Sequence, residues 1–285
     1  MTRNVVIRDG QPTWYFSPDI WVVPGDDPEG APGSPEAGRP AYLWAHVQNV
    51  GDEEVRGARV GFYWANPAGQ IVEGVAHKVG FGYADLPAGA GQDVLCLTPW
   101  VPSVVNGGHE CLLAVAHFSG GHLPSDPLPV GFAFDPPAYP EIAQKNLTVL
   151  PAGTHLTQAL MIAALPRVDK AVTVVAEVGG EVEKEALARL GLRGRRPAQE
   201  HGVRVGLTRT PECRAGQDDL GPRELEVRLP RGTAAAVYAQ VEVRDLGLRE
   251  YVLVHLSERE GDRVLGGLGL VVVSGQGVSG QEVDA

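Results

Sequence analysis

The segment that most constrains the fold is residues 41–64, AYLWAHVQNVGDEEVRGARVGFYW. Its first half alternates, with Leu43, Ala45 and Val47 on one side and larger or polar residues on the other. A period of two is typical of a strand that buries one face. An Asn-Val-Gly turn and an acidic segment follow, and then a second alternating strand is predicted at 60–64. Such a pair forms the front of a β-sandwich, and nothing in it marks a catalytic centre.

The length of 285 residues fits two domains of ordinary size. The 37 Gly and 23 Pro are scattered without a repeat, which favours many short strands joined by turns. We therefore predict an all-β chain of two tandem immunoglobulin-like β-sandwiches, over residues 1–137 and 138–285. The boundary is placed in residues 135–140, DPPAYP, because three prolines favour a stiff, extended linker.

The second unit is predicted to differ from the first by one short helix. Residues 181–190, EVEKEALARL, place Val182, Ala186 and Leu190 on one stripe, and Gly191 suits the end of a helix. A short helix that crosses between sheets is common in sandwiches, so we interpret it as structural. The tail that follows Gly275 is predicted to be disordered.

Composition and charge exclude several classes of function. The apolar runs are too short to span a bilayer. The N-terminus lacks the apolar core of a signal peptide, so we expect a cytoplasmic chain unless export uses a non-classical route. The net charge is −11, and most of it falls in residues 1–140. An acidic surface of this kind disfavours nucleic-acid binding.

The first unit resembles the CARDB-type (cell-adhesion-related) immunoglobulin-like domains of bacteria, over about residues 15–150. The positions that carry the resemblance are Val47, Asn49, Gly51, Val60, Phe62 and Tyr63. The resemblance implies an add-on module found beside enzymes or surface proteins, with no catalytic residues to transfer. Independently of the family, Asn49 and Gly51 are residue types that tolerate a left-handed backbone between strands.

Histidine and acidic residues are candidate metal ligands. His109 and His117 would lie about 26 Å apart along an unbroken strand, so they cannot share one ion. His117, His122 and Asp126 are able to do so only across a loop. The acidic runs, which are Asp26, Asp27 and Glu29, then Asp52, Glu53 and Glu54, then Asp218 and Asp219, lack the spaced order of an EF-hand. We interpret the acidic runs as solvated loops and predict no metal and no cofactor.

Cysteine and arginine residues offer two further candidate sites. His109 and Cys111 would share one side of a strand, yet a cysteine at such a point normally packs in the core. For Cys96 and Cys111 we favour buried free thiols, with a bridge between neighbouring strands as the alternative. The basic run of Arg193, Arg195 and Arg196 lacks interleaved aromatic residues and is interpreted as a solvated loop.

Aromatic residues supply the candidate binding site. Trp44 and Trp64, with most other aromatic side chains of the first unit, suit a sandwich core. Trp14, Tyr15 and Phe16 are consecutive near the N-terminus and are predicted to form an exposed aromatic patch for protein or carbohydrate.

These patterns favour a non-enzymatic structural or protein-interaction module of the adhesion type. The expected partner is another protein or a second copy of the chain, with a glycan as a further option. One alternative is an accessory carbohydrate-binding or peptidase-associated module. A second is a self-assembling shell or appendage subunit, because exposed edge strands favour association.

Overall fold

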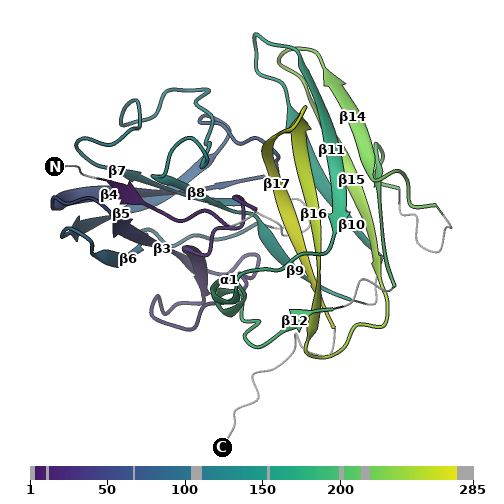
Figure 1. Cartoon of the computed structure of the whole chain (residues 1–285), viewed down its shortest axis with the longest axis horizontal. Helices are drawn as coiled ribbons and strands as arrows, with labels where there is room; N and C mark the ends of the chain where they lie inside the picture. The colour runs from purple at the N-terminus through teal and green to yellow at the C-terminus, as the bar shows by residue number, and fades with distance from the viewer. Residues whose placement is uncertain are drawn as a thin grey trace, which may run out of the picture.

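We describe a computed structural model of the chain for residues 4–10, 13–66, 68–103, 111–152, 155–198, 202–212 and 219–274. In these residues the chain is all-β apart from one short helix, and two immunoglobulin-like β-sandwiches lie side by side (Figure 1). The predicted fold class is therefore confirmed. No helix of the described residues is long and apolar enough to cross a membrane. His109, Asp218 and the predicted disordered tail lie outside the described residues.

The first sandwich packs a sheet of four strands against another sheet of four strands. One sheet contains β1 (Val5–Val6), β2 (Ile20–Pro24), β3 (Ala41–Asn49) and β6 (Gly91–Leu95). The other has the order β5 (His77–Leu86), β4 (Val55–Ala65), β7 (Cys111–His117) and β8 (Ile142–Lys145). Leu43, Ala45 and Val47 of β3 are fully buried between the sheets, as their alternation predicts.

The second sandwich packs a small sheet against a large one. The small sheet has the order β10 (Leu156–Ala163), β15 (Ala234–Val243) and β13 (Val203–Thr208). The large sheet has the order β14 (Glu224–Leu229), β11 (Lys170–Val178), β16 (Glu250–Glu260), β17 (Arg263–Val273) and β9 (Leu147–Pro151), and β12 (Arg196–Pro197) pairs with β16. The helix α1 spans Lys184–Arg189, which is shorter than the predicted 181–190.

The chain passes from the first sandwich to the second at Asn146. Strand β8 pairs with β7, whereas β9 pairs with β17. The crossing therefore comes after β8, and the predicted linker at 135–140 lies before it. The Pro140 carbonyl accepts a hydrogen bond from the Ile7 amide, so the end of this segment is also tied to the first unit. Strand β8 is buried along its whole length, and a strand of this kind needs a partner in a sheet.

The sequence also favours strands at residues 72–79 and 130–134 of the first unit, and both predictions differ from the structure. The strand predicted at 72–79 lies later, because β5 begins at His77 and continues through a glycine-rich stretch. The strand predicted at 130–134 is absent among the described residues. That segment contributes only one isolated bridge, between Ala133 and Val72.

Asn49 acts through its side chain and not through a left-handed backbone. Neither Asn49 nor Gly51 has a positive φ, which corrects the reason given for them above. The Asn49 side chain is buried, and its Nδ2 donates to the carbonyls of Glu53 at 2.7 Å and Leu86 at 3.0 Å. Its Oδ1 accepts the Gly51 amide at 3.0 Å. A single amide therefore satisfies backbone groups from two turns.

Candidate functional site

The predicted aromatic patch lies mostly inside the junction between the sandwiches. Tyr15 is 4% and Phe16 5% exposed, and Trp14 is half-buried beside them. The expectation of exposure is therefore wrong for Tyr15 and Phe16. The outer face of β17 carries Gly269, where a Cβ would overlap the Phe16 ring, so glycine lets this ring pack against the strand. Burial raises the pKa of the Tyr15 phenol. A binding role for the three residues stays a prediction.

Helix α1 and the N-terminal segment complete the junction through an apolar layer. Val182, Leu187 and Leu190, in α1 or next to it, pack with Tyr15 and Phe16 over the outer face of the large sheet. This layer is separate from the cores of the two sandwiches. The first unit thus supplies part of the cover for the second, and the two units form one packed body.

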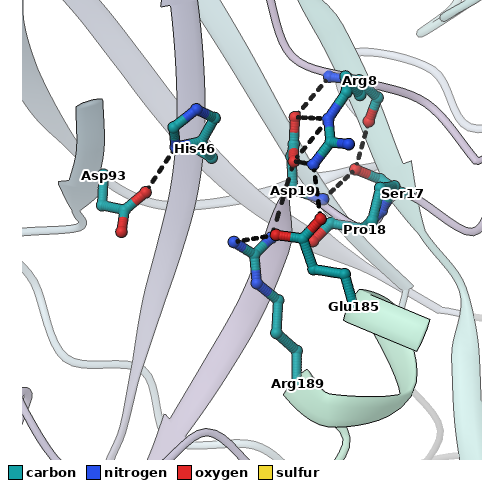
Figure 2. Close-up of polar contacts among 8 residues, drawn as sticks. All are labelled: Arg8, Ser17, Pro18, Asp19, His46, Asp93, Glu185 and Arg189. Carbon is teal, nitrogen blue, oxygen red and sulfur yellow. Dashed lines mark hydrogen bonds and ion pairs between the residues drawn. The ribbon is translucent and has the colours of Figure 1, made fainter. Parts of the chain in front are cut away.

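A charge network borders this apolar layer (Figure 2). The Asp19 carboxylate is 1% exposed, and the Arg8 guanidinium holds it with contacts of 2.6 to 3.1 Å. Arg8 also reaches Glu185 of α1 at 2.9 Å, and Arg189 of α1 lies 3.7 Å from Asp19. The carboxylates of Asp19 and Glu185 raise the pKa of the Arg8 guanidinium. This network links the two units by opposite charges.

The outer face of β5 presents aromatic side chains that the sequence analysis missed. Phe81 is 37% and Tyr83 is 56% exposed, while Gly82 between them faces the interior. A Cβ at Gly82 would overlap the Leu95 carbonyl oxygen, so glycine is needed here for the two sheets to close. The strand therefore buries a face of small residues and leaves its aromatic face in solvent.

An apolar residue and two cations extend this face. The Leu97 side chain is 67% exposed, and the Leu97 amide donates to the Phe81 carbonyl at 3.1 Å. The Lys78 Nζ and the Arg59 Cζ lie 5.6 and 5.9 Å from the centre of the Phe81 ring. Arg59 is also paired in register with Tyr83. The β5 surface is defined here as Phe81, Tyr83, Leu97, Arg59 and Lys78.

The histidines considered as metal ligands have separate partners near this surface. The His117 Nε2 lies 3.1 Å from the Ser125 carbonyl, and the His122 Nδ1 lies 2.8 Å from Glu141. Asp126 accepts a hydrogen bond from the Arg59 Nε at 2.9 Å, and Arg59, His117 and Asp126 line a cavity of about 420 Å³. Burial lowers the pKa of His117. In the described residues, no group of three or more His, Cys, Asp or Glu side chains is placed to hold a metal.

The cysteine, arginine and acidic residues that the sequence offered as candidate sites show no sign of a binding role in the described residues. Cys96 and Cys111 are buried thiols that form no disulfide and belong to different apolar clusters. Burial raises the pKa of Cys96. Arg195 donates to the Leu248 carbonyl at 2.7 Å, and Arg196 pairs with Glu250 at 3.1 Å, so both tie the loop that follows α1 to the large sheet. Asp26, Asp27 and Glu29 are largely exposed.

A signal for the β5 surface was present in the sequence. From residue 79 to 84, VGFGYA, large and small residues alternate strictly. The usual assignment buries the large residues of such a strand. Here the sheets approach too closely for large side chains, and the aromatic residues face outward. The close packing of β6 on β5 decides which face of β5 is exposed. Residues 79–84 alone do not indicate that β6 packs there.

Comparison with known proteins assigns no family to this chain. No family model matches the sequence, and no curated protein matches it. Solved structures that resemble the chain include red sea bream transglutaminase, with 10% identity over 95% of this chain and 31% of that one, at a TM-score of 0.21. They also include CBD12 from CALX1.2, with 12% identity over 81% of this chain and 92% of that one, at a TM-score of 0.20. The chain spans about a third of the transglutaminase, and both scores are too low to support any inference about function.

Proposed function

We propose that this chain is a non-catalytic binding module that holds a protein partner against the β5 surface. The observation that carries the proposal is the exposure of Phe81, Tyr83 and Leu97 beside two cations on one sheet face. Aromatic residues and arginine are enriched where protein interfaces derive most of their binding energy. The resemblance of the first unit to adhesion-type domains supports the same class of function.

The geometry of the β5 surface favours a protein over a glycan. The rings of Phe81 and Tyr83 lie 5.6 Å apart at an interplanar angle of 72°. At that angle only one of the two rings is able to lie flat against a sugar ring, so the pair forms no continuous stacking platform. An edge-to-face pair with two cations near the Phe81 ring suits the mixed apolar and polar contacts of a protein partner.

The junction between the sandwiches supports a rigid module. A rigid scaffold lowers the entropic cost of presenting a binding face, because few side chains and no domain orientation have to be ordered on binding. The β5 surface itself is held by the closure of β5 on β6, where Leu97 and Phe81 are joined through their backbone. Binding is therefore expected to leave the backbone of the first sandwich unchanged.

A capture experiment with matched variants tests the proposal. The chain is immobilised as wild type, as the double variant Phe81→Ser/Tyr83→Ser, and as Val168→Ser. Val168 is 61% exposed on a turn of the second unit and serves as the control. Proteins captured from lysate of the source cells are identified, purified and measured against each variant by calorimetry.

We expect one protein to bind the wild type and the Val168→Ser control equally. The double variant, which loses both rings, should bind this protein at least about tenfold more weakly, the effect of losing central aromatic contacts. Equal binding of the identified partner to the double variant would overturn the proposal. The proposal would also be overturned if the double variant lost only self-association or only glycan binding.

A further inference from the structure

A cavity of about 240 Å³ lies at the junction, apart from the β5 surface. It is enclosed by β2, β7, β8, β9, the end of α1 and the loop that follows β2. Its walls are about half polar and half apolar, and the apolar half includes Val22, Trp100, Leu112 and Leu190. Such a volume is smaller than the pockets that hold drug-sized ligands but exceeds the space that one water molecule needs.

One charged side chain, Lys145, lines this cavity among the described residues. Lys145 lies at the end of β8, where its partner in register is the core residue Leu112. It is 4% exposed, its pKa is set by burial and by a second cation, Arg189, and no hydrogen bond or ion pair of its Nζ is found within the described part of the chain. Lysine is almost never buried to this degree unless it is paired. The unpaired amine is therefore the feature of the cavity that needs an explanation.

The surroundings of Lys145 favour an anionic ligand with a single charge. The charged group that acts on Lys145 is the Arg189 guanidinium, which adds positive potential. Arg189 is itself engaged by Asp19 and Glu185, so it is not available to a ligand. One available ammonium suits one carboxylate, whereas a phosphate dianion would lack a second cation. The apolar half of the lining suits a short hydrocarbon chain attached to that carboxylate.

We propose that the junction cavity is a binding site for a small organic carboxylate, with its carboxylate group on Lys145 Nζ and its hydrocarbon part against Trp100, Leu112 and Leu190. This site is independent of the proposed partner surface, because none of its lining residues belongs to the β5 surface. The carboxylate of the ligand would supply a negative charge beside Lys145, where the described residues place none. It would also contact both sandwiches and α1, and therefore stabilise the junction.

Binding at this site is coupled to protonation of Lys145. Burial, reinforced by the nearby Arg189, lowers the pKa of Lys145 to about 7. A bound carboxylate favours the charged amine, so binding near and above neutral pH takes up a proton. Above pH 7 each further pH unit should weaken the affinity by up to tenfold, because the amine must first be protonated.

Calorimetric titration with hexanoate tests the site, with methyl hexanoate as the uncharged counterpart. The variants are Lys145→Met, which keeps the length and apolar character of the side chain, and Leu190→Phe, which narrows the cavity from α1. Lys184→Met is the control, since Lys184 is exposed on the same helix. Circular dichroism verifies that each variant is folded. Titrations at pH 6.5 and 8.5, in buffers of different ionisation enthalpy, measure the protons taken up.

We expect hexanoate to bind the wild type and Lys184→Met alike, and at least tenfold more weakly to Lys145→Met and Leu190→Phe. Binding should be weaker at pH 8.5 than at 6.5, with proton uptake, and methyl hexanoate should not compete. The proposal is overturned if the folded wild type fails to bind hexanoate, or if Lys145→Met binds it as well as the wild type does. It is equally overturned if hexanoate and its methyl ester bind alike. Binding of the protein partner to the β5 surface should be the same in Lys145→Met as in the wild type. Failure of the carboxylate site would then leave the proposed function unaffected.

Discussion

The Arg189 guanidinium carbon lies 4.0 Å from the centre of the Trp21 ring. Arg189 ends helix α1 of the second unit, and Trp21 lies on β2 of the first. Trp21 is stacked in turn on Trp44, with ring centres 5.9 Å apart. The same arginine donates to the Pro18 carbonyl. A cation on an aromatic stack therefore anchors the helix to the neighbouring sandwich, beside the buried Asp19.

Asp19→Asn should weaken the junction more than its single charge suggests. The carboxylate is buried between Arg8 and Arg189, so its removal leaves these two cations with Glu185, which is half-exposed, as their shared counter-charge. We expect the free energy of unfolding to fall by about 3 kcal/mol. Urea denaturation at pH 7 measures this change. Glu54→Gln removes an exposed partner of Arg56 and should cost less than about 1 kcal/mol. Equal effects of both variants would contradict the network's role.

Gly266→Ala should separate the two units locally. A Cβ at Gly266 of β17 would overlap the carbonyl oxygen of Gly69, which belongs to the first unit. The backbone at Gly69 has to move, so we expect a loss of about 1–3 kcal/mol in unfolding free energy and a larger radius of gyration in small-angle X-ray scattering. Gly33→Ala is the control, because its Cβ would make only an ordinary contact of 3.6 Å. An unchanged radius and stability for Gly266→Ala would refute the close approach.

Lys145 should make the stability of the protein depend on pH between about 7 and 10. The folded chain releases the Lys145 proton near pH 7, whereas an unfolded lysine keeps it to about pH 10.4. Between these values the unfolded state binds more protons, so raising the pH favours the folded state by about 1.4 kcal/mol per pH unit. The Lys145→Met variant should lack this slope. Parallel stability curves for wild type and variant, with Lys184→Met as control, would contradict the burial of the amine.

Gln144→Leu should stabilise the protein. The Gln144 side chain is fully buried, and neither its Nε2 nor its Oε1 has a hydrogen-bond partner among the described residues. Replacing an unsatisfied buried amide by an apolar side chain of similar size should raise the unfolding free energy by about 1–2 kcal/mol. The neighbouring Asn146→Leu is the matched comparison. It should destabilise, because the Asn146 Nδ2 donates to the Gly267 carbonyl at 2.7 Å. Thermal unfolding of both variants distinguishes the two cases.

The strands of the first sandwich were predictable where one face is buried and the other is open. Leu43, Ala45 and Val47 alternate with larger residues, and the structure buries them as the pattern predicts. The unit boundary was not predictable in the same way. Strand β8 is buried on both faces and has no alternation, so its membership depends on pairing with β7, which is distant in the sequence.

The candidate sites depended still more on distant contacts. From the sequence, Tyr15 and Phe16 suit a surface patch. In the structure, a glycine of β17 lies opposite the Phe16 ring and lets it pack in the junction. From the sequence, Phe81 and Tyr83 suit a core. In the structure, β6 packs closely on Gly82, so these two rings face outward. In both cases the exposure of an aromatic ring is set by the residue it faces in another strand. Local period and composition carry no information on that residue.

Photocrosslinking from position 83 tests the central claim most directly. With p-benzoylphenylalanine in place of Tyr83, the chain should form one covalent adduct with a protein of the source-cell lysate. Excess wild-type chain should abolish this adduct by competition, and excess Phe81→Ser chain should not. Absence of any adduct, or equal competition by both chains, would contradict recognition through the outer face of β5.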